Sequence, residues 1–391
     1  MKILYLTYYF EPDLCAGSFR NTSLVKELSS LIKPDDCIHV VTTMPNRYKS
    51  YSKEALAFEK RKNIEINRII LPAHKSGFID QAIAFFTFFK EALVLTKKRK
   101  YDLIFASSSR LFTAFLGRII SGRKNAPLYL DIRDIFVDTM QDVLKNKLIK
   151  HPFMSILKYF EKYTFSGATH INLISGGFES YFKRYHNASI TFYSNGIDEE
   201  FLEIPVSTNL PDDKYLITYA GNIGEGQGLH KIIPEAAKML GSKYHFRIIG
   251  DGGMRNILAK SLEGNNIKNV ELLLPVGREK LKEFYSETHF LFIHLNDYQA
   301  FKKVLPSKIF EYGALDKPII AGVAGYASDF IRKYIKNYIL FLPGDATSLV
   351  NQLKFYKYKF EKRDEFRNTF ERRQINILLA KSILSNIKKD Y

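Results

Sequence analysis

LPSKIFEYGALDKP, residues 305–318, combines the start of a helix with groups that suit a phosphorylated, hydroxyl-rich ligand. Pro306 suits a first helical position, because its φ is already helical and its missing N–H would be unpaired there. The free N–H groups from Ser307 onward, the helix dipole and the charge of Lys308 favour phosphate. Glu311 lies four residues after Ser307, on the same face, where its carboxylate can accept from two vicinal hydroxyls. This segment therefore predicts a helix that binds an anion at its start and a hydroxylated ring one turn later.

The same segment also fits an ordinary amphipathic core helix. In that interpretation Ile309, Phe310 and Leu315 point inward, while Lys308 and Glu311 form a solvated pair. The rest of the chain favours the binding site over this alternative.

Short apolar runs alternate with helical stretches from the first residue, which is typical of parallel strands joined by crossover helices. In open sheets of this kind, ligands bind outside the carboxyl ends of the strands. The expected strands of the first half are Lys2–Tyr9, Ile38–Thr43, Ile64–Leu71, Asp102–Ser107, Pro127–Ile132, Thr169–Ser175 and Thr191–Tyr193.

The composition changes at EIPVSTNLPDDK, residues 203–214, which reads as a linker. A second alternating series follows. Its expected elements are the strands Tyr215–Ala220, Tyr244–Ile249, Val270–Leu274, His289–Leu295 and Pro318–Gly322 and the helix Leu229–Leu240. We therefore predict an α/β fold with two Rossmann-like domains, residues 1–202 and 215–360, that face each other.

The last segment, residues 361–391, is basic and helical and has no strand beside it. Its apolar stripe is expected at Phe366, Phe370, Ile377 and Leu378. Such a helix can cross back and brace the first domain.

Two loops of the first half carry candidate functional residues. After the first strand, EPDLCAGSFRN contains Gly17, where the backbone can approach a ligand, and Asn21, which can cap the next helix. After the fifth strand, LDIRDIFVD places Asp131, Arg133 and Asp134 at a carboxyl edge, where acid–base chemistry is expected. The alternatives are a bare turn and a structural ion-pair network.

The loop GNIGEGQG, residues 221–228, follows the first strand of the second half, and its backbone can cradle a diphosphate. Its glycines match neither the dinucleotide fingerprint nor a Walker A pattern, so NAD is disfavoured. The turn GDGG, residues 250–253, lies on the same edge and is expected to be structural.

The 391 residues carry a net charge of +17, from 58 Lys and Arg against 41 Asp and Glu, which calls for an anionic partner. A phosphorylated substrate and a lipid surface rank above nucleic acid, because no nucleic-acid motif is found. Cys15 and Cys37 suggest neither a disulfide framework nor a zinc site. The chain begins directly in a strand, without the pattern of a signal peptide, so a cytoplasmic location is expected.

The segment from Phe78 to Lys100 is the most apolar of the chain, but it is too polar to span a bilayer. Four phenylalanines and a basic end suit a helix in an anionic membrane interface. The alternative is a helix buried against the sheet. The residues concerned are Phe85, Phe86, Phe88, Phe89, Lys97, Lys98, Arg99 and Lys100.

Six motifs in order resemble the retaining GT-B glycosyltransferases of family 4, and among them the bacterial O-antigen and capsular polysaccharide branch with its fucosamine-transferase-like enzymes. The motifs are AGSFRN, YLDIRDIFVDT, SNGID, YAGNIGEGQGL, GDG and LPSKIFEYGALDKPIIAG. The resemblance implies that the C-terminal domain holds a nucleotide sugar, that the N-terminal domain holds the acceptor, and that no metal or other cofactor is needed.

By this resemblance, Glu311 binds ribose, and Lys308 and the helix start bind diphosphate. The phosphate loop is lined by Asn222, Gly224 and Gln227. The implied donor-binding set is Gly17, Asn222, Gly224, Gln227, Gly228, Asp251, Arg278, Pro306, Ser307, Lys308 and Glu311. The implied catalytic set is Asp131, Arg133, Asp134 and Lys308.

The chain departs from the family at two places. Many members have Arg and Lys where this loop has Asn222 and Gln227, and an acidic residue where this chain has Lys303. Lys308 must then supply more of the positive charge, helped by Arg278, and the donor sugar is left open.

The expected function is retaining transfer from a UDP-sugar to a lipid-diphosphate-linked saccharide at the inner membrane face, in cell-surface polysaccharide synthesis. The alternatives are a GT-B-like UDP-sugar epimerase or phosphorylase, and a non-enzymatic basic module that binds lipid or nucleic acid.

Overall fold

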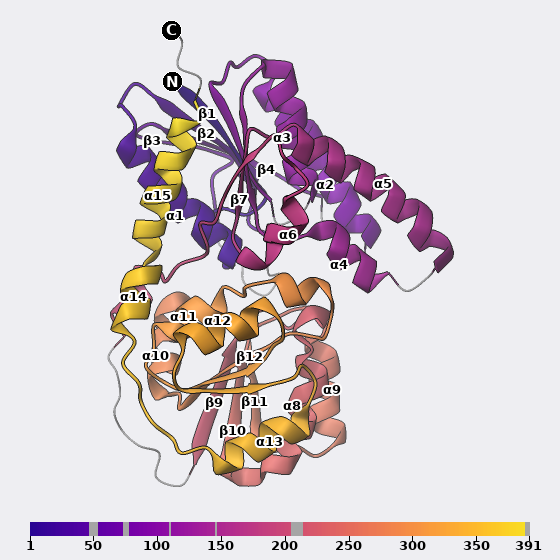
Figure 1. Ribbon diagram of the computed structural model, residues 1–391, viewed down its shortest axis with the longest axis vertical. Helices are drawn as coiled ribbons and strands as arrows, with labels where there is room; N and C mark the ends of the chain where they lie inside the picture. The colour runs from indigo at the N-terminus through magenta and orange to yellow at the C-terminus, as the bar shows by residue number, and fades with distance from the viewer. Residues whose placement is uncertain (47–53, 73–77, 109–110, 145–146, 205–213, 388–391) are drawn as a thin grey trace. The chain divides into compact units, whose positions relative to one another are not determined.

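The computed structural model describes residues 1–46, 54–72, 78–108, 111–144, 147–204 and 214–387. The chain forms two compact units. Unit 1 comprises Met1–Asn195 and Arg373–Tyr391, and unit 2 comprises Gly196–Arg372. Each is a sheet covered by helices on both faces (Figure 1). The two α/β domains predicted from the sequence are confirmed, and so is the return of the C-terminal helix to the first of them.

Among the described residues, unit 1 has an eight-stranded sheet in the order β3-β4-β2-β1-β5-β6-β7-β8. Its strands are parallel except β3, which pairs antiparallel with β4 at the edge. Six of the seven predicted strands are present, β8 overlaps the predicted range 191–193 only at Thr191, and β3, a short polar FEKR run, was missed. The strands are β1 (Lys2–Thr7), β2 (Cys37–Thr43), β3 (Phe58–Arg61), β4 (Ile64–Ile69), β5 (Leu103–Ser108), β6 (Leu128–Ile132), β7 (His170–Leu173) and β8 (Ser189–Thr191).

Helices cover both faces of this sheet. On one face, Leu24 and Leu28 of α1 and Leu379 of α15 pack in one core cluster with residues of β1, β2, β5 and β6. On the other face α3 lies against β5, with α2 and α5 beside it (Figure 1). The helical elements are α1 (Ala16–Leu31), α2 (Phe78–Thr96), α3 (Leu111–Lys124), α4 (Phe136–Val143), α5 (Lys147–Ser166), η1 (Gly176–Phe178), α6 (Glu179–Phe182) and α15 (Arg372–Ser385).

The structure places the α2 phenylalanines between the two interpretations, because Phe86 is exposed whereas Phe85 and Phe89 are half-buried. Phe88 is fully buried, and Phe85 and Phe89 pack on the α3 rings of Phe112 and Phe115. The helix is needed to cover β2 and β4, and this turns most of its aromatic side chains inward. The large apolar residues that α2 exposes are Ile83, Phe86 and Val94. Over the described part of the chain, no helix combines the length and apolar character needed to cross a membrane.

Unit 2 has a parallel six-stranded sheet, counted over the described residues, in the order β11-β10-β9-β12-β13-β14. The five predicted strands are present, and β14 was missed. The strands are β9 (Tyr215–Ala220), β10 (Tyr244–Ile249), β11 (Val270–Leu273), β12 (Phe290–His294), β13 (Ile319–Gly322) and β14 (Tyr338–Phe341).

Helices α8, α9 and α13 cover one face of this sheet around a single apolar core. Elsewhere in the unit, rings of α11, α12 and α14 form a cluster in which Phe310, Phe330 and Phe370 contact one another. The helical elements are α7 (Glu199–Leu202), η2 (Glu225–Gln227), α8 (Leu229–Leu240), η3 (Gly241–Lys243), α9 (Arg255–Gly264), α10 (Arg278–Glu287), η4 (Ala300–Lys303), α11 (Lys308–Gly313), α12 (Tyr326–Tyr334), α13 (Ala346–Phe355) and α14 (Asp364–Phe370).

The boundary between the units differs from the predicted one. The Ile197 amide donates to the carbonyl oxygen of Phe370 (2.7 Å) and the Arg372 amide to that of Ile197 (2.9 Å), so both segments belong to unit 2. The predicted domains 1–202 and 215–360 therefore shift to a division after Asn195 and after Arg372. Most of the predicted linker, residues 205–213, lies outside the described residues.

The predicted apolar stripe of the C-terminal segment is also wrong in its second half. Phe366 and Phe370 are buried, but they belong to α14, which ends before α15 begins. Because Glu371 breaks the helix, the phase changes, and Leu378 is 53% exposed while Ile377 is half-buried. The buried face of α15 is instead formed by Ile375, Leu379, Ala380 and Ile383.

Arg363 anchors the end of α11, the helix of the 305–318 segment. Its buried guanidinium donates to the carbonyl oxygens of Tyr312 (3.0 Å), Leu315 and Lys317 (2.7 Å) and to Asn337. Burial lowers its pKa to about 10. These bonds satisfy carbonyls that a helix end leaves unpaired, and they fix where α11 stops.

Replacing Arg363 with Met should therefore destabilise unit 2 by about 2–4 kcal/mol, because three carbonyls lose their donor inside the protein. Urea unfolding measures the loss, and hydrogen exchange should show faster opening of residues 308–317. Lys362→Met, at the exposed neighbouring position, is the control. Equal effects of the two variants would show that Arg363 does not hold the helix.

Candidate functional site

Helix α11 begins at Lys308, two residues later than predicted. Ser307 is its N-cap and makes no side-chain cap bond, and Pro306 lies just before it. The first turn is tight, since the amides of Ile309 and Phe310 donate to the carbonyl oxygens of Pro306 and Ser307 (both 3.1 Å). The amides of Ser307 and Lys308 precede these bonds, so the start of the helix still presents donors.

Lys308 reaches from α11 toward the loop that follows β9. Its ammonium lies 5.6 Å from the centroid of the Tyr219 ring. A Cβ on Gly221 would lie 2.5 Å from the Lys308 Nζ, so the glycine leaves room for the side chain. Burial lowers the pKa of Lys308, and Glu311 opposes this effect. The ammonium forms no ion pair with any residue that the structure describes, and its charge remains available.

Glu311 is half-buried on the next turn of α11. The Tyr285 hydroxyl lies 3.4 Å from its Oε2 and donates to it. The adjacent Tyr312 hydroxyl accepts from the amide of Ala220 (3.3 Å), which ties α11 to the end of β9. The carboxylate is therefore held from one side, and its other lone pairs can accept from a ligand.

The loop of residues 221–228 is held by its own side chains. Asn222 Nδ2 and the Gly224 amide both donate to Gln227 Oε1, at 2.8 and 3.2 Å. Gly228 has φ +61°, and a Cβ there would lie 2.2 Å from Asn296 Oδ1. The hydrogen bond from Asn222 to Gln227 Oε1 uses one donor of Asn222 and leaves the side-chain N–H groups of Gln227 for a ligand.

The second glycine turn is structural, as predicted. Gly250 has φ +151°, and a Cβ there would lie 1.8 Å from the carbonyl oxygen of Gly221. The Asp251 carbonyl accepts from Ile223 (2.8 Å), and its carboxylate accepts from the Gly252 amide (2.8 Å). Asp251 thus holds the two turns together.

Arg278 does not take the predicted place at a phosphate. Its guanidinium pairs with Asp198 (2.8 Å) and Glu200, and it lies over the Phe201 ring. Asp198 also pairs with Arg372. Arg278 therefore fastens the first residues of unit 2 to α10.

Asp131, predicted to be catalytic, lies in a closed network at the end of β6. Its oxygens accept from Arg20 at 2.9 and 2.8 Å and from Asn172 at 2.8 Å, and both members of the ion pair are fully buried. Arg20 also donates to the carbonyl oxygens of Tyr193 and Ser194. The geometry gives Asp131 a structural role, because its carboxylate is fully buried and a sugar substrate cannot reach it. Arg20 was missed, although it belongs to the AGSFRN motif.

Gly17 lies in the first turn of α1 and not in a loop before it. The helix starts at Ala16, so Asn21 does not cap it and instead donates to Thr7 Oγ1 (2.6 Å). A Cβ on Gly17 would lie 2.4 Å from Arg133 Nη1. Arg133 thus lies directly against the start of a 16-residue helix.

The Arg133 guanidinium has no hydrogen-bond acceptor among the described residues, and its Nε is buried. Burial lowers its pKa. The α1 start carries no acidic residue and no side-chain cap. An unpaired guanidinium beside free helix amides can bind an anion.

Asp134 stands next to Arg133 and has an unusual pKa. Burial raises this pKa to about 6, although the hydrogen bond from the Thr139 hydroxyl (3.3 Å) acts to lower it. A carboxylate that titrates near neutral pH can exchange a proton with a substrate. Unit 1 therefore combines a candidate anion site with a candidate base.

The family comparison concerns unit 2. Residues 200–373 match the model described as "Glycosyl transferases group 1". Over this range unit 2 is similar to group 1 glycosyl transferases. The match covers the 221–228 loop, Lys308 and Glu311, so these candidate residues lie inside the matched range.

Among curated proteins, the chain is 26% identical over 191 residues to WcaI of Escherichia coli K12, named "Putative colanic acid biosynthesis glycosyl transferase". The match covers 46% of this chain and 47% of that protein, so this chain matches about half the length of its curated relative.

Solved structures resemble the whole chain. The Anabaena protein Alr3699/HepE, in complex with UDP and glucose, has a TM-score of 0.69 at 14% identity over 98% of this chain and 100% of that one. The lipopolysaccharide outer core galactosyltransferase WaaB has a TM-score of 0.62 at 14% identity, over 98% and 99%. At such identities the likeness shows the fold, which is GT-B as the motifs predicted.

Within unit 2, the sequence analysis missed Tyr285 and Tyr312. Both hold the α11 region, but Tyr285 lies 26 residues before Glu311 on another helix. No local pattern connects a tyrosine in REKLKEFYSE with a carboxylate on α11. Such pairs arise only when the two helices pack.

Asp134→Asn should stabilise unit 1 at about pH 7.5 by about 1–2 kcal/mol, because the folded state no longer buries a charge there. The Asp134 pKa is higher folded than unfolded. The free-energy cost of burying the Asp134 charge is therefore complete above the folded pKa. It decreases as the pH falls through about 6 toward the usual pKa of an aspartate.

Urea midpoints at about pH 7.5 and about pH 5.5 test this, and the variant should show the flatter pH dependence. Asp35→Asn, at an exposed position, is the control. A variant that is less stable than the parent at the higher pH, or that keeps the parent's slope, would contradict the assignment.

Proposed function

We propose that this chain is a retaining glycosyltransferase that moves a sugar from a UDP-sugar to a lipid-diphosphate-linked saccharide in cell-surface polysaccharide synthesis. In this proposal unit 2 holds the donor and unit 1 holds the acceptor, on the cytoplasmic face of a membrane. One observation carries the proposal. Lys308, a cation without an ion-pair partner among the described residues, lies one turn before the carboxylate of Glu311, within the range that matches group 1 glycosyl transferases.

The chemistry of this pair suits a nucleoside diphosphate. The Glu311 carboxylate can accept from both ribose hydroxyls, while Lys308 and the α11 start face the diphosphate. The UDP in the HepE structures supports the choice of base, and the names of WcaI and WaaB support a surface-polysaccharide product.

Lys308 would offset the charge that develops on the departing diphosphate, the work that a metal performs elsewhere. We therefore propose a reaction without metal. With retention, the departing phosphate can itself take the acceptor proton. Asp134 would then orient the acceptor hydroxyl, and Arg133 with the α1 start would bind an acceptor phosphate.

Glu311→Ala should weaken UDP binding about 10- to 100-fold, since two ribose hydroxyls lose a charged acceptor worth about 1–3 kcal/mol. Isothermal titration of the full chain with UDP measures this, with GDP and an oligonucleotide as alternative ligands. Glu283→Ala, at an exposed position of α10, is the matched control.

Wild-type affinity for UDP in Glu311→Ala would remove the ribose assignment. Preference of the parent for the oligonucleotide would instead favour a nucleic-acid-binding module. Turnover of the UDP-sugar without an acceptor would favour an epimerase or a hydrolase.

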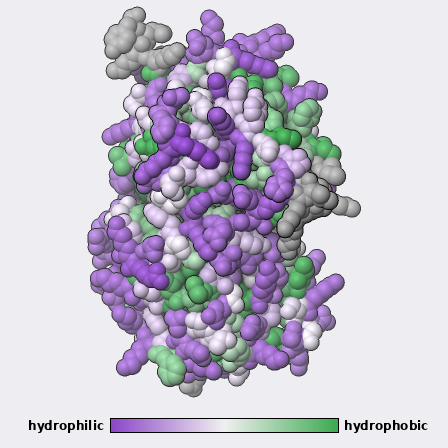
Figure 2. Space-filling model, turned by 45° about the vertical axis from the view of Figure 1, so that its right-hand side comes forward, coloured by the Kyte–Doolittle hydropathy of each residue, from purple (hydrophilic) through white to green (hydrophobic). Residues whose placement is uncertain are grey.

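A membrane-linked acceptor requires a surface that meets lipid, and the helix layer of α2, α3 and α5 offers one. On α2, Phe86 is 69% and Val94 60% exposed, and on α5, Ile156 is 55% and Tyr159 70% exposed. Lysines 90, 158 and 162 are exposed on the same helices, and lysines 97 and 98 are exposed directly after α2. Exposed apolar side chains among lysines suit an anionic bilayer surface. Figure 2 shows a mostly hydrophilic face with scattered hydrophobic patches.

A variant with Ser at positions Phe86, Val94, Ile156 and Tyr159 should lose co-sedimentation with phosphatidylglycerol liposomes and keep UDP affinity. Leu378→Ser removes an apolar residue that is 53% exposed on α15, over the other face of the sheet, and should change nothing. Binding should also weaken with salt. A parent protein that ignores anionic liposomes would point to a soluble acceptor.

A further inference from the structure

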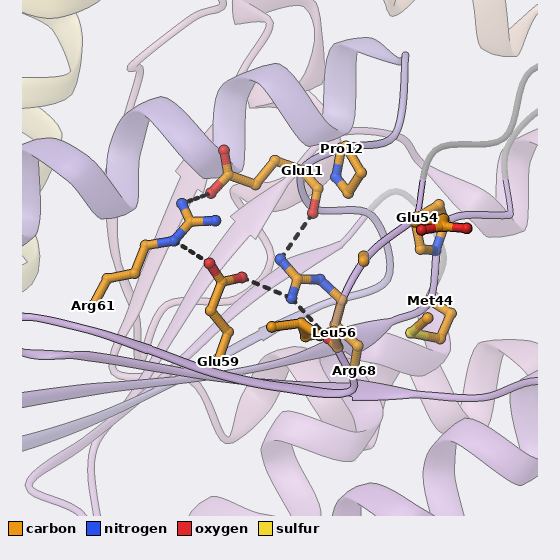
Figure 3. A pocket seen from close by; sticks show the side chains of 10 residues that line it. Glu11, Pro12, Met44, Glu54, Leu56, Glu59, Arg61 and Arg68 are labelled. Carbon is orange, nitrogen blue, oxygen red and sulfur yellow. Dashed lines mark hydrogen bonds and ion pairs between the residues drawn. The ribbon is translucent and has the colours of Figure 1, made fainter.

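A cavity of about 610 Å³ lies in unit 1 (Figure 3). Glu11 and Pro12 follow β1, Met44 and Pro45 follow β2 directly, and Arg68 is the last residue but one of β4. The cavity therefore lies at the carboxyl edge of parallel strands, where open α/β sheets bind ligands. Its full lining is Glu11, Pro12, Met44, Pro45, Glu54, Ala55, Leu56, Glu59, Arg61 and Arg68.

One wall is a chain of alternating charges. Arg61 pairs with Glu11 (2.5 Å) and with Glu59, and Glu59 pairs with Arg68 (3.0 Å). In Figure 3 this chain lies to one side, with Pro12, Met44 and Glu54 on the other. The wall thus presents alternating carboxylate and guanidinium groups. The carboxylates can accept hydrogen bonds from a ligand, and the guanidinium groups can donate them.

Arg68 makes this wall rigid. Its side chain is only 2% exposed, and it donates to the carbonyl oxygens of Leu56 (3.0 Å) and Glu11 (3.2 Å). Its Nε is buried without an acceptor among the described residues. The cavity is therefore preformed, with a buried donor left over.

The charge of the lining selects the ligand class. Glu11, Glu54 and Glu59 outnumber Arg61 and Arg68, which is an acidic balance in a chain of net charge +17. A phosphate or a uronate would meet an excess carboxylate here, in contrast to the anion site at Arg133.

A neutral sugar fits both kinds of surface. Its hydroxyls can donate to the carboxylates and accept from the guanidinium groups, while its apolar face packs on Pro12, Met44 or Leu56. The volume is within the usual range for small-molecule sites, about 300–1,000 Å³.

We propose that this cavity binds a neutral sugar residue of the acceptor saccharide. The term acceptor depends on the proposed function, whereas sugar binding itself does not. The loop after β1 carries Glu11 and Pro12 and runs into the α1 start, where Gly17 meets Arg133. An acceptor whose phosphate lies at Arg133 can therefore place a nearby sugar in the cavity.

The test is saturation-transfer NMR on the full chain with methyl β-D-glucoside, methyl β-D-galactoside and methyl α-D-mannoside, and with glucose 6-phosphate as the anionic counterpart. At least one neutral glycoside should give a signal that falls at least about fivefold in the Glu54→Gln/Met44→Ala variant. Glu65→Gln, in which a β4 carboxylate outside the cavity is changed, should keep the signal.

Three outcomes would overturn the inference. The neutral glycosides give no signal, the signal survives in the double variant, or glucose 6-phosphate gives the stronger variant-sensitive signal. Thermal unfolding of the double variant, compared with the parent, separates lost binding from lost fold.

UDP titration distinguishes this inference from the proposed function. UDP binding without sugar binding would remove the cavity assignment alone. Sugar binding without UDP binding would leave a saccharide site in a protein that is not the proposed enzyme.

Discussion

The buried ion pair between Arg20 and Asp131 is the interaction on which the edge of unit 1 depends. Taking two charges out of water is costly, and the pair is stable because its remaining donors and acceptors are also satisfied. Ser107, Asn172 and the carbonyl of Tyr193 complete the network. It links α1 to β5, β6 and β7, and this fixes the α1 start against the residues after β6. The position of Gly17 beside Arg133 follows from that link.

Unit 2 uses cations in a related way, at helix ends. Lys317 donates to the carbonyl oxygens of Tyr285, Ser286 and Thr288, and burial lowers its pKa to about 8. Arg363 does the same at the end of α11. These two side chains hold the helices that carry Tyr285 and Glu311. Part of the positive charge of the chain thus serves the interior, and net charge overstates what is available to an anionic partner.

The carboxyl edge of unit 1 contains two neighbouring environments of opposite character. Arg133 itself is a cation without a hydrogen-bond acceptor for its side chain among the described residues, which suits a phosphate. Around Glu59 and Arg68 the charges are paired, with a carboxylate in excess, which suits hydroxyls. A substrate with a phosphate next to a sugar has this same order of groups. The loop between β1 and α1 connects the two environments, because it carries Glu11 and Pro12 and runs into the α1 start, where Gly17 lies against Arg133.

Local chemistry in the sequence determined the alternation of strands and helices, the division into two α/β domains and the 305–318 segment with Lys308 and Glu311. Apolar periodicity and the N–H groups of a helix start are properties of neighbouring residues, so they can be read from the chain. Tertiary structure alone decided that Asp131 pairs with Arg20, that Arg278 pairs with Asp198, and that Arg133 is unpaired. Each depends on which distant side chain packing brings within about 3 Å, because a charge acts according to its partner and its burial.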